Sequence, residues 1–100
     1  MEYSITNNSG ACQAAMNGEF SFNDNPGVRK MIGELEKENA TSCVLDMSGL
    51  NSIDSAGLGM ILLINDAVKK SGKAMSIRGA SGQVLKMLDI SRFSDIVTIE

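Results

Sequence analysis

Apolar residues in this sequence repeat with the period of a β-strand in some segments and with the period of an α-helix in the segments between them. Strand-like patterns occupy Tyr3–Thr6, Cys12–Met16, Cys43–Leu45, Met75–Ile77 and Ile96–Ile99. Helix-like patterns run from about Pro26 to Glu38, from Ser55 to Lys70 and from Gly82 to Leu88. Strands that alternate with helices predict a largely parallel sheet flanked by helices. The chain is therefore expected to adopt an α/β fold in the order β-β-α-β-α-β-α-β, with a mixed sheet of four or five strands.

Turn and cap residues lie between these elements. Asn7–Gly10 is rich in turn-forming residues, which predicts that the first two strands pair as a hairpin. Asn25 before Pro26 is typical of a helix start, and Ser81 is a suitable cap for the third helix. Met47–Ser52 is expected to form a turn between the third strand and the second helix.

Length and charge limit the function classes that remain. One hundred residues are enough for only one core, so residues 1–100 are expected to form a single domain. A formal net charge of −3 and scattered Lys and Arg residues argue against nucleic acid as a partner. Leu58–Ile64, the longest strongly apolar run, is far shorter than the ~20 residues that span a bilayer, and Met1–Gly10 lacks the features of a signal peptide. We therefore expect a cytoplasmic protein that does not bind membranes.

The residue types needed for common catalytic and metal sites are missing. The sequence has no His, and Cys12 and Cys43 lie far apart, so we expect two reduced, buried thiols, no metal site and no Ser-His-Asp triad. Hydrolysis by paired carboxylates would require Asp46 and Asp54 to flank a cleft, for which so small a domain has little room. The sequence therefore predicts a protein that is not an enzyme and has no catalytic residues.

The most specific motif lies in Val44–Leu63. An apolar strand ends at Asp46, and after a short connection Asp-Ser-Ala-Gly-Leu-Gly, residues 54–59, opens an apolar helix. This arrangement resembles the signature of the STAS domain family, whose best-known members are the bacterial anti-sigma factor antagonists. Gly18-Glu19-Phe20 resembles the family's Gly-Glu-Leu, and the helix near the chain end occupies the place of the family's last helix. The resemblance covers nearly the whole chain and implies a single STAS domain, residues 1–100.

The resemblance also implies a role for Ser55. In the antagonists, the matching Ser is phosphorylated by a serine kinase that is also the anti-sigma factor. The unphosphorylated form binds this kinase and frees the sigma factor, and a serine phosphatase resets the cycle. Many relatives have a second Ser where this chain has Ala56, and an Asp where it has Ser21, so Ser55 is the one candidate hydroxyl in the motif.

Physical arguments support a phosphate at Ser55. Unpaired N–H groups and the positive end of the helix dipole favour an anion at a helix start. A phosphate adds about −1.5 to −2 charge beside Asp54, which would repel a partner that fits a neutral hydroxyl. The second helix is also more apolar than packing on a sheet requires, which predicts a partner surface with Met60 and Leu62 exposed. We expect this surface to comprise Asp54, Ser55, Ala56, Gly57, Leu58, Met60 and Leu62.

Simpler interpretations of the same residues remain open. Ser55 or Asp54 is suited to capping the helix, and Asp46 to accepting backbone N–H groups in a turn. Gly57 and Gly59 allow close approach of another backbone, but the third Gly of a phosphate-binding loop is replaced by Leu62, so no cofactor is expected.

Two other functions remain as alternatives. The first is an accessory STAS subunit, of a lipid-transport ATPase or another signalling complex, that is never phosphorylated. The second is a nucleotide sensor, which the sequence does not support. We expect a monomer or a weak dimer.

Overall fold

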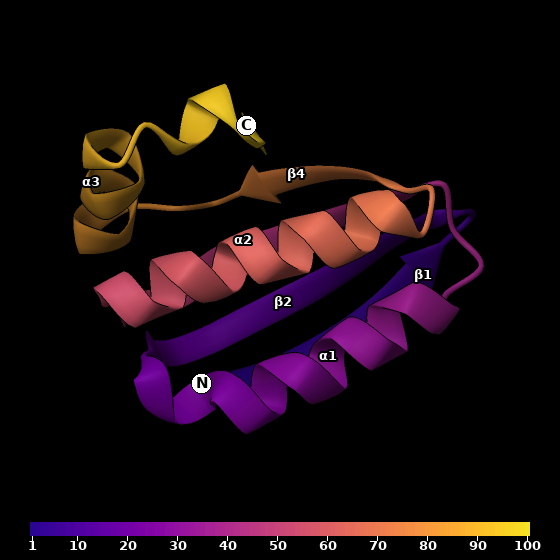
Figure 1. Ribbon diagram of the computed structural model, residues 1–100, viewed down its shortest axis with the longest axis horizontal. Helices are drawn as coiled ribbons and strands as arrows, with labels where there is room; N and C mark the ends of the chain where they lie inside the picture. Colours follow the sequence, from indigo (N-terminus) through magenta and orange to yellow (C-terminus); the bar gives the residue numbers. More distant parts are fainter.

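Five strands and three helices alternate along the chain in the predicted order. The computed structural model describes residues 1–100. The elements are β1 (Glu2–Asn8), β2 (Ala11–Phe20), α1 (Asn25–Lys37), β3 (Ser42–Ile53), α2 (Ser55–Lys70), β4 (Ala74–Arg78), α3 (Gly82–Ile90) and β5 (Thr98–Ile99), with the short 3-10 helices η1 (Phe22–Asp24) and η2 (Phe93–Asp95) (Figure 1).

All five strands belong to one mixed sheet in the order β1-β2-β3-β4-β5. β1 and β2 are antiparallel and form the predicted hairpin, whereas β2–β3, β3–β4 and β4–β5 are parallel pairs. The hairpin loop consists of Ser9 and Gly10, whose φ angles of 56° and 91° are both positive. Two positive φ angles are typical of the tight turns that fit the twist of a hairpin.

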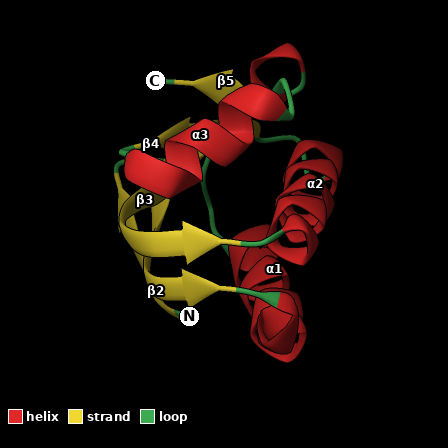
Figure 2. Cartoon of the chain, turned by 90° about the vertical axis from the view of Figure 1, so that its left-hand side faces the viewer, coloured by secondary structure: helices red, strands yellow, loops and turns green.

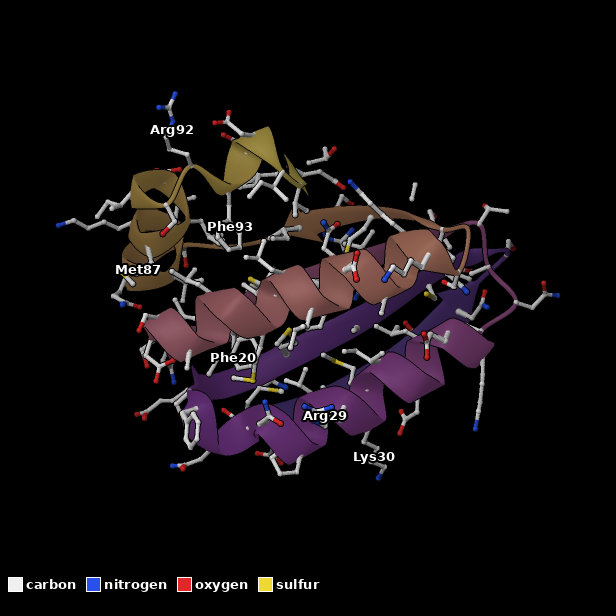
Figure 3. All side chains as sticks on the ribbon, in the orientation of Figure 1. Phe20, Arg29, Lys30, Met87, Arg92 and Phe93 are labelled. Carbon is white, nitrogen blue, oxygen red and sulfur yellow. The ribbon has the colours of Figure 1, made fainter.

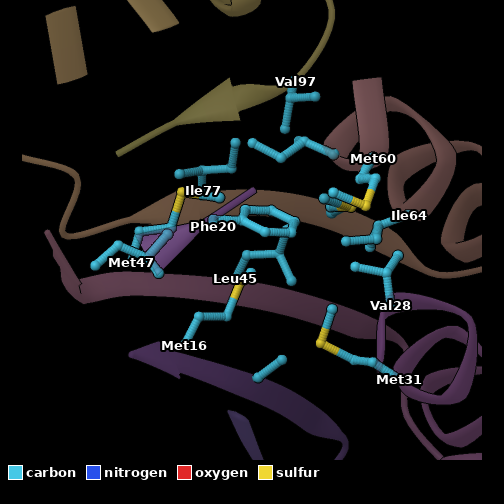
Figure 4. Close-up of a cluster of buried hydrophobic side chains, with 14 of the residues drawn as sticks. Met16, Phe20, Val28, Met31, Leu45, Met47, Met60, Ile64, Ile77 and Val97 are labelled. Atoms are coloured by element: carbon cyan, nitrogen blue, oxygen red, sulfur yellow. The ribbon is translucent and has the colours of Figure 1, made fainter. Parts of the chain in front are cut away.

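Helices α1 and α2 lie side by side on one face of the sheet, as Figure 2 shows. Side chains alternate across the strands, so in β2, in the first half of β3 and in β4 alternate residues face these helices and are buried. Figure 4 shows part of the resulting core, where Phe20 from β2 lies among Leu45, Ile77 and side chains of α2. The opposite sheet face carries small and polar residues such as Ser4, Gln13 and Ser76.

The predicted turn at Met47–Ser52 is wrong, because β3 continues without a break to Ile53. This second half pairs with the long strand β2, from Asn17 opposite Gly49 to Phe20 opposite Ile53. The register between β2 and β3 shifts at two places, and these irregularities accommodate the turn-like residues within the strand. The extension carries β3 directly to the start of α2.

The chain ends also differ in detail from the predictions. The last strand covers only Thr98–Ile99, because η2 and a turn occupy the residues before it. Asp24 occupies the cap position of α1 without a capping hydrogen bond from its side chain, and Asn25 is the first residue of the helix. Ser81 precedes α3 as predicted, but its hydroxyl makes no capping hydrogen bond. None of the helices is long and apolar enough to cross a membrane.

The two cysteines are free and buried, as predicted. Cys12 and Cys43 are register partners on the neighbouring strands β2 and β3. Burial, followed by a hydrogen bond with Cys12, raises the pKa of Cys43 to about 12. Since the thiolate is the reactive form, this pair is a packing element of the core.

Candidate functional site

Ser55 lies at the junction where β3 ends and α2 begins. It is the first residue of α2 and its side chain is exposed. Asp54 occupies the cap position, and its Oδ1 accepts the Gly57 N–H at 2.7 Å. Asp54 is therefore the helix cap, as one interpretation of the sequence predicted, and the capping role considered for Ser55 is wrong. The Ser55 hydroxyl remains available at the surface.

The second carboxylate oxygen of Asp54 fixes a neighbouring segment. Oδ2 accepts the Phe22 N–H at 3.3 Å, and the Asp54 N–H donates to the Phe20 carbonyl at 3.2 Å. These bonds hold η1 against the start of α2. They place Phe22, with 72% of its surface exposed, beside the Ser55 segment. The sequence analysis did not identify Phe22, although an aromatic residue directly after the Gly-Glu-Phe-Ser stretch was the available signal.

Helix α3 holds the other side of this junction. The Gln83 side-chain amide pairs with the Ile53 backbone as the backbone of a neighbouring strand would. Its Oε1 accepts the Ile53 N–H at 2.9 Å, and its Nε2 donates to the Ile53 carbonyl at 2.8 Å. Ile53 is the last residue of β3 and lies two positions before Ser55. No local sequence pattern indicates this contact, since the two residues are thirty positions apart.

The outer side of α2 carries an exposed stripe, which we define as Ser55, Gly59, Leu62, Leu63 and Asp66. Leu62 and Leu63 are 39% and 51% exposed, which confirms that an apolar helix face is left uncovered.

Three members of the predicted partner surface, Gly57, Leu58 and Met60, are buried. Met60 is only 3% exposed, so the prediction of an exposed Met60 is wrong, and Leu58 is buried as well. Both face the core because they lie on the side of α2 that packs on the sheet. Ala56 is half-buried, and Asp54 and Ser55 are exposed.

The two motif glycines differ in their surroundings. A Cβ at Gly57 would lie 2.6 Å from Ile53 Cγ1 and 2.9 Å from the Phe20 carbonyl oxygen, so a neighbouring strand end requires glycine there. A Cβ at Gly59 would have no other atom within 4 Å. Nothing in the chain explains a glycine at Gly59, although this residue weakens a helix interior by roughly 0.5–1 kcal/mol relative to alanine.

Asp46 has the structural role that the sequence predicted. Its Oδ1 accepts the Ser48 N–H at 3.0 Å and the Ser48 hydroxyl at 2.8 Å. These bonds, with a smaller effect of Arg78, lower the pKa of Asp46. Asp54 binds different partners, so the two carboxylates share no contact.

The surface around Ser55 is not hollowed. The two hollows of the molecule are lined by residues of β1, α1 and their ends, and neither includes a residue of α2. The exposed stripe and Phe22 together form a partly apolar surface outside these hollows. Such a surface is suited to contact with another protein.

Comparison with known proteins identifies relatives over nearly the full length. A model of the STAS domain family matches residues 2–100. The anti-sigma-B factor antagonist of Bacillus subtilis is 27% identical over 97 residues, covering 95% of this chain and 86% of that protein.

Two solved structures show the same fold. An anti-sigma factor antagonist from Mycobacterium paratuberculosis superposes with a TM-score of 0.85 and 13% identity, covering 98% of this chain and 83% of that one. The Bacillus cell fate determinant SpoIIAA in its phosphorylated form superposes with a TM-score of 0.70 and 14% identity, covering 99% of this chain and 91% of that one.

Proposed function

The chain belongs to the STAS domain family, and on this basis we propose that it is an anti-sigma factor antagonist controlled by phosphorylation of Ser55. In this proposal the unphosphorylated form binds an anti-sigma factor serine kinase in the cytoplasm. Phosphorylation releases the kinase, and a serine phosphatase restores the binding form. The observation that carries the proposal is the exposed Ser55 hydroxyl, which the helix cap leaves free because Asp54 performs the capping.

The start of α2 can accept a phosphate without loss of the fold. The first four N–H groups of a helix lack partners within the helix. Here the Asp54 side chain satisfies one of them, the Gly57 N–H, and the Asp54 carbonyl accepts the first helical bond, from the Leu58 N–H at 3.1 Å. The Ser55 and Ala56 N–H groups remain for a phosphate, and the helix dipole favours negative charge at this end.

The same phosphate would oppose binding of a partner. It would place about −1.5 to −2 charge next to the Asp54 carboxylate and close to an apolar surface. A partner that covers this surface would have to strip water from both negative groups, which is costly unless it supplies cations. Release of the kinase follows from this electrostatic cost.

We propose that the kinase contacts the exposed stripe together with Asp54, Ala56 and Phe22. Aromatic and aliphatic side chains surrounded by polar groups are typical centres of protein interfaces. Gly59 lies in the middle of the stripe, and the open space above it lets a partner backbone approach the helix closely. In this role the chain acts by binding alone, without a cofactor or a catalytic residue.

Incubation with ATP and the cognate kinase, followed by mass spectrometry, tests the proposal. We expect one phosphate, on Ser55, and none in a Ser55→Ala control. A dominant phosphate on Ser48, Ser52 or Ser81 would contradict the site. No covalent phosphate at all would favour the alternative of an accessory STAS subunit, in a lipid-transport ATPase or another signalling complex.

A further inference from the structure

Strand β1 forms an open edge of the sheet. Each of its seven residues pairs in regular antiparallel register with β2, from Glu2 opposite Asn17 to Asn8 opposite Ala11. β1 ends the sheet, so its other side has no neighbouring strand. Natural edge strands are usually protected by Pro, Lys, a bulge or short length, and β1 has none of these. Its outward N–H and C=O groups can therefore pair with another strand.

A groove runs between this edge and α1. One hollow of about 440 Å³ is lined by Met1–Ile5, Lys30 and Glu34, and a second of about 350 Å³ is lined by Ile5, Glu34, Lys37 and Glu38. The two hollows are adjacent along this edge, because Ile5 and Glu34 line both of them. A helix beside an open sheet edge is an arrangement used for strand addition, because it accepts the side chains of the added strand.

We propose that β1 pairs antiparallel with β1 of a second copy of this chain, forming a symmetric dimer with a continuous sheet. The two-fold axis would be perpendicular to the sheet, so that α1 of both copies lies on the same face. The added strand would direct its Tyr3 and Ile5 into the groove between β1 and α1.

The position of the axis follows from the alignment of β1 with α1. The Met1 amino group contacts Asp24 Oδ1 at 2.8 Å, and the Asn7 side-chain amide donates to the Asn39 carbonyl at 3.2 Å. The two elements therefore run side by side in the same direction. Ser4, midway along this stretch of β1, lines the same hollow as Lys30 and Glu34, which belong to the middle and second half of α1.

An axis through Ser4 brings opposite charges together. Lys30 of each copy would face Glu34 of the other, and Tyr3 would pair with Ile5 across the new strand boundary, an aromatic with a β-branched residue. Lys30 projects from α1 away from α2, as Figure 3 shows, and is free to reach across. An axis through Ile5 would instead bring the two Glu34 side chains together. Charge complementarity therefore selects the register centred on Ser4.

The same charges favour a second copy over a foreign peptide. The α1 wall of the groove alternates Lys30, Glu34, Lys37 and Glu38, so neither a uniformly acidic nor a uniformly basic peptide matches it. A second copy in the register centred on Ser4 matches it, because Lys30 of each copy then faces Glu34 of the other. The groove shares no residue with the exposed stripe, so this inference does not depend on the proposed function.

Sedimentation equilibrium of the full chain from micromolar to millimolar concentration tests the dimer. We expect reversible dimerisation, with β1 amide hydrogen exchange slowing as concentration rises. Lys30→Glu and Glu34→Lys should each raise the dimer Kd on the order of tenfold, because symmetry creates two like-charge contacts. The double variant Lys30→Glu/Glu34→Lys should restore the parent Kd. Lys86→Glu on α3 is the matched control and should leave the Kd unchanged.

A chain that stays monomeric at millimolar concentration would overturn the proposal, even if a foreign peptide bound to the same edge. A dimer that is insensitive to Lys30→Glu, or a double variant that stays as weak as the single ones, would overturn the register. Thermal melts separate these outcomes from misfolding. Lys30 makes no ion pair within the chain, so Lys30→Glu tests the interface even if the loss of the Tyr3–Glu34 hydrogen bond weakens the other variant.

Discussion

Replacing Gly57 or Gly59 by alanine adds one methyl group at each position. The two variants distinguish a glycine that packing within the chain requires from a glycine that contact with a partner requires. At Gly57 the new Cβ would meet Ile53 Cγ1 at 2.6 Å and the Phe20 carbonyl oxygen at 2.9 Å. Neither can move freely, because the Ile53 side chain is buried in the core and the Phe20 carbonyl accepts the Asp54 N–H. Overpacking of this kind costs about 1–3 kcal/mol, against a gain of roughly 0.5–1 kcal/mol in helix propensity. Gly57→Ala should therefore lose about 1 kcal/mol of stability.

Gly59→Ala should have the opposite effect on the fold. Its Cβ meets no atom within 4 Å, so only the gain in helix propensity remains, roughly 0.5–1 kcal/mol. At about 4–8 °C per kcal/mol, the Tm should rise by several degrees. The methyl group would nevertheless stand in the exposed stripe between Ser55 and Leu62. If the kinase backbone approaches there, a misfit of about 1–3 kcal/mol weakens binding on the order of tenfold or more.

Thermal melts and calorimetric titration of the kinase into each variant measure the two effects. The expected result is a more stable Gly59→Ala that binds less tightly. A Gly59→Ala variant that binds as well as the parent would refute the close approach of a partner at this position. A Gly57→Ala variant more stable than the parent would refute the packing argument at the β3–α2 junction.

Four further outcomes are expected. Ser55→Asp should keep the parent Tm, because the helix dipole stabilises the carboxylate by roughly 0.3–1 kcal/mol. The same variant should bind the kinase weakly in titrations. Ser55→Ala should stay bound to the kinase in the presence of ATP. Leu62→Glu should fold normally and lose kinase binding in the same titration, and intact binding would place the surface elsewhere. Gln83→Leu should speed hydrogen exchange at the Ile53 amide and lower the affinity for the kinase, and unchanged exchange would argue against the role of Gln83. Because the pKa of Asp46 is lowered in the folded state, its contribution to stability is present above about pH 4 and is lost as pH falls through the folded-state pKa. The Tm values of Asp46→Asn and of the parent should therefore converge in acid.

Local patterns in the sequence were sufficient for the order of elements and for the position of Ser55. The period of the apolar residues identified each helix, and the hairpin and the Asp54 cap depend on residues close together in the chain. The length of β3 depends instead on pairing with β2, and residues such as Ser48, Gly49 and Asn51 favour a turn when considered alone. Long-range pairing overrode that preference.

The exposed side of α2 was predicted only in part, for a similar reason. An apolar helix shows that some residues are exposed, but the sheet decides which side is covered, and it covers Met60 and leaves Leu63 open. Phe22 and Gln83 reach the junction through contacts across about thirty residues. No short-range pattern contains that information.

The β3–α2 junction is attached to η1 and to α3, so the surface around Ser55 depends on the folded conformation. Its shape exists only while three separate parts of the chain are assembled, so a synthetic peptide spanning residues 48–62 would lack it. A kinase that recognises this shape would ignore unfolded or newly synthesised copies and modify only mature ones. Every phosphorylated copy in a cell would then come from the pool of correctly folded protein.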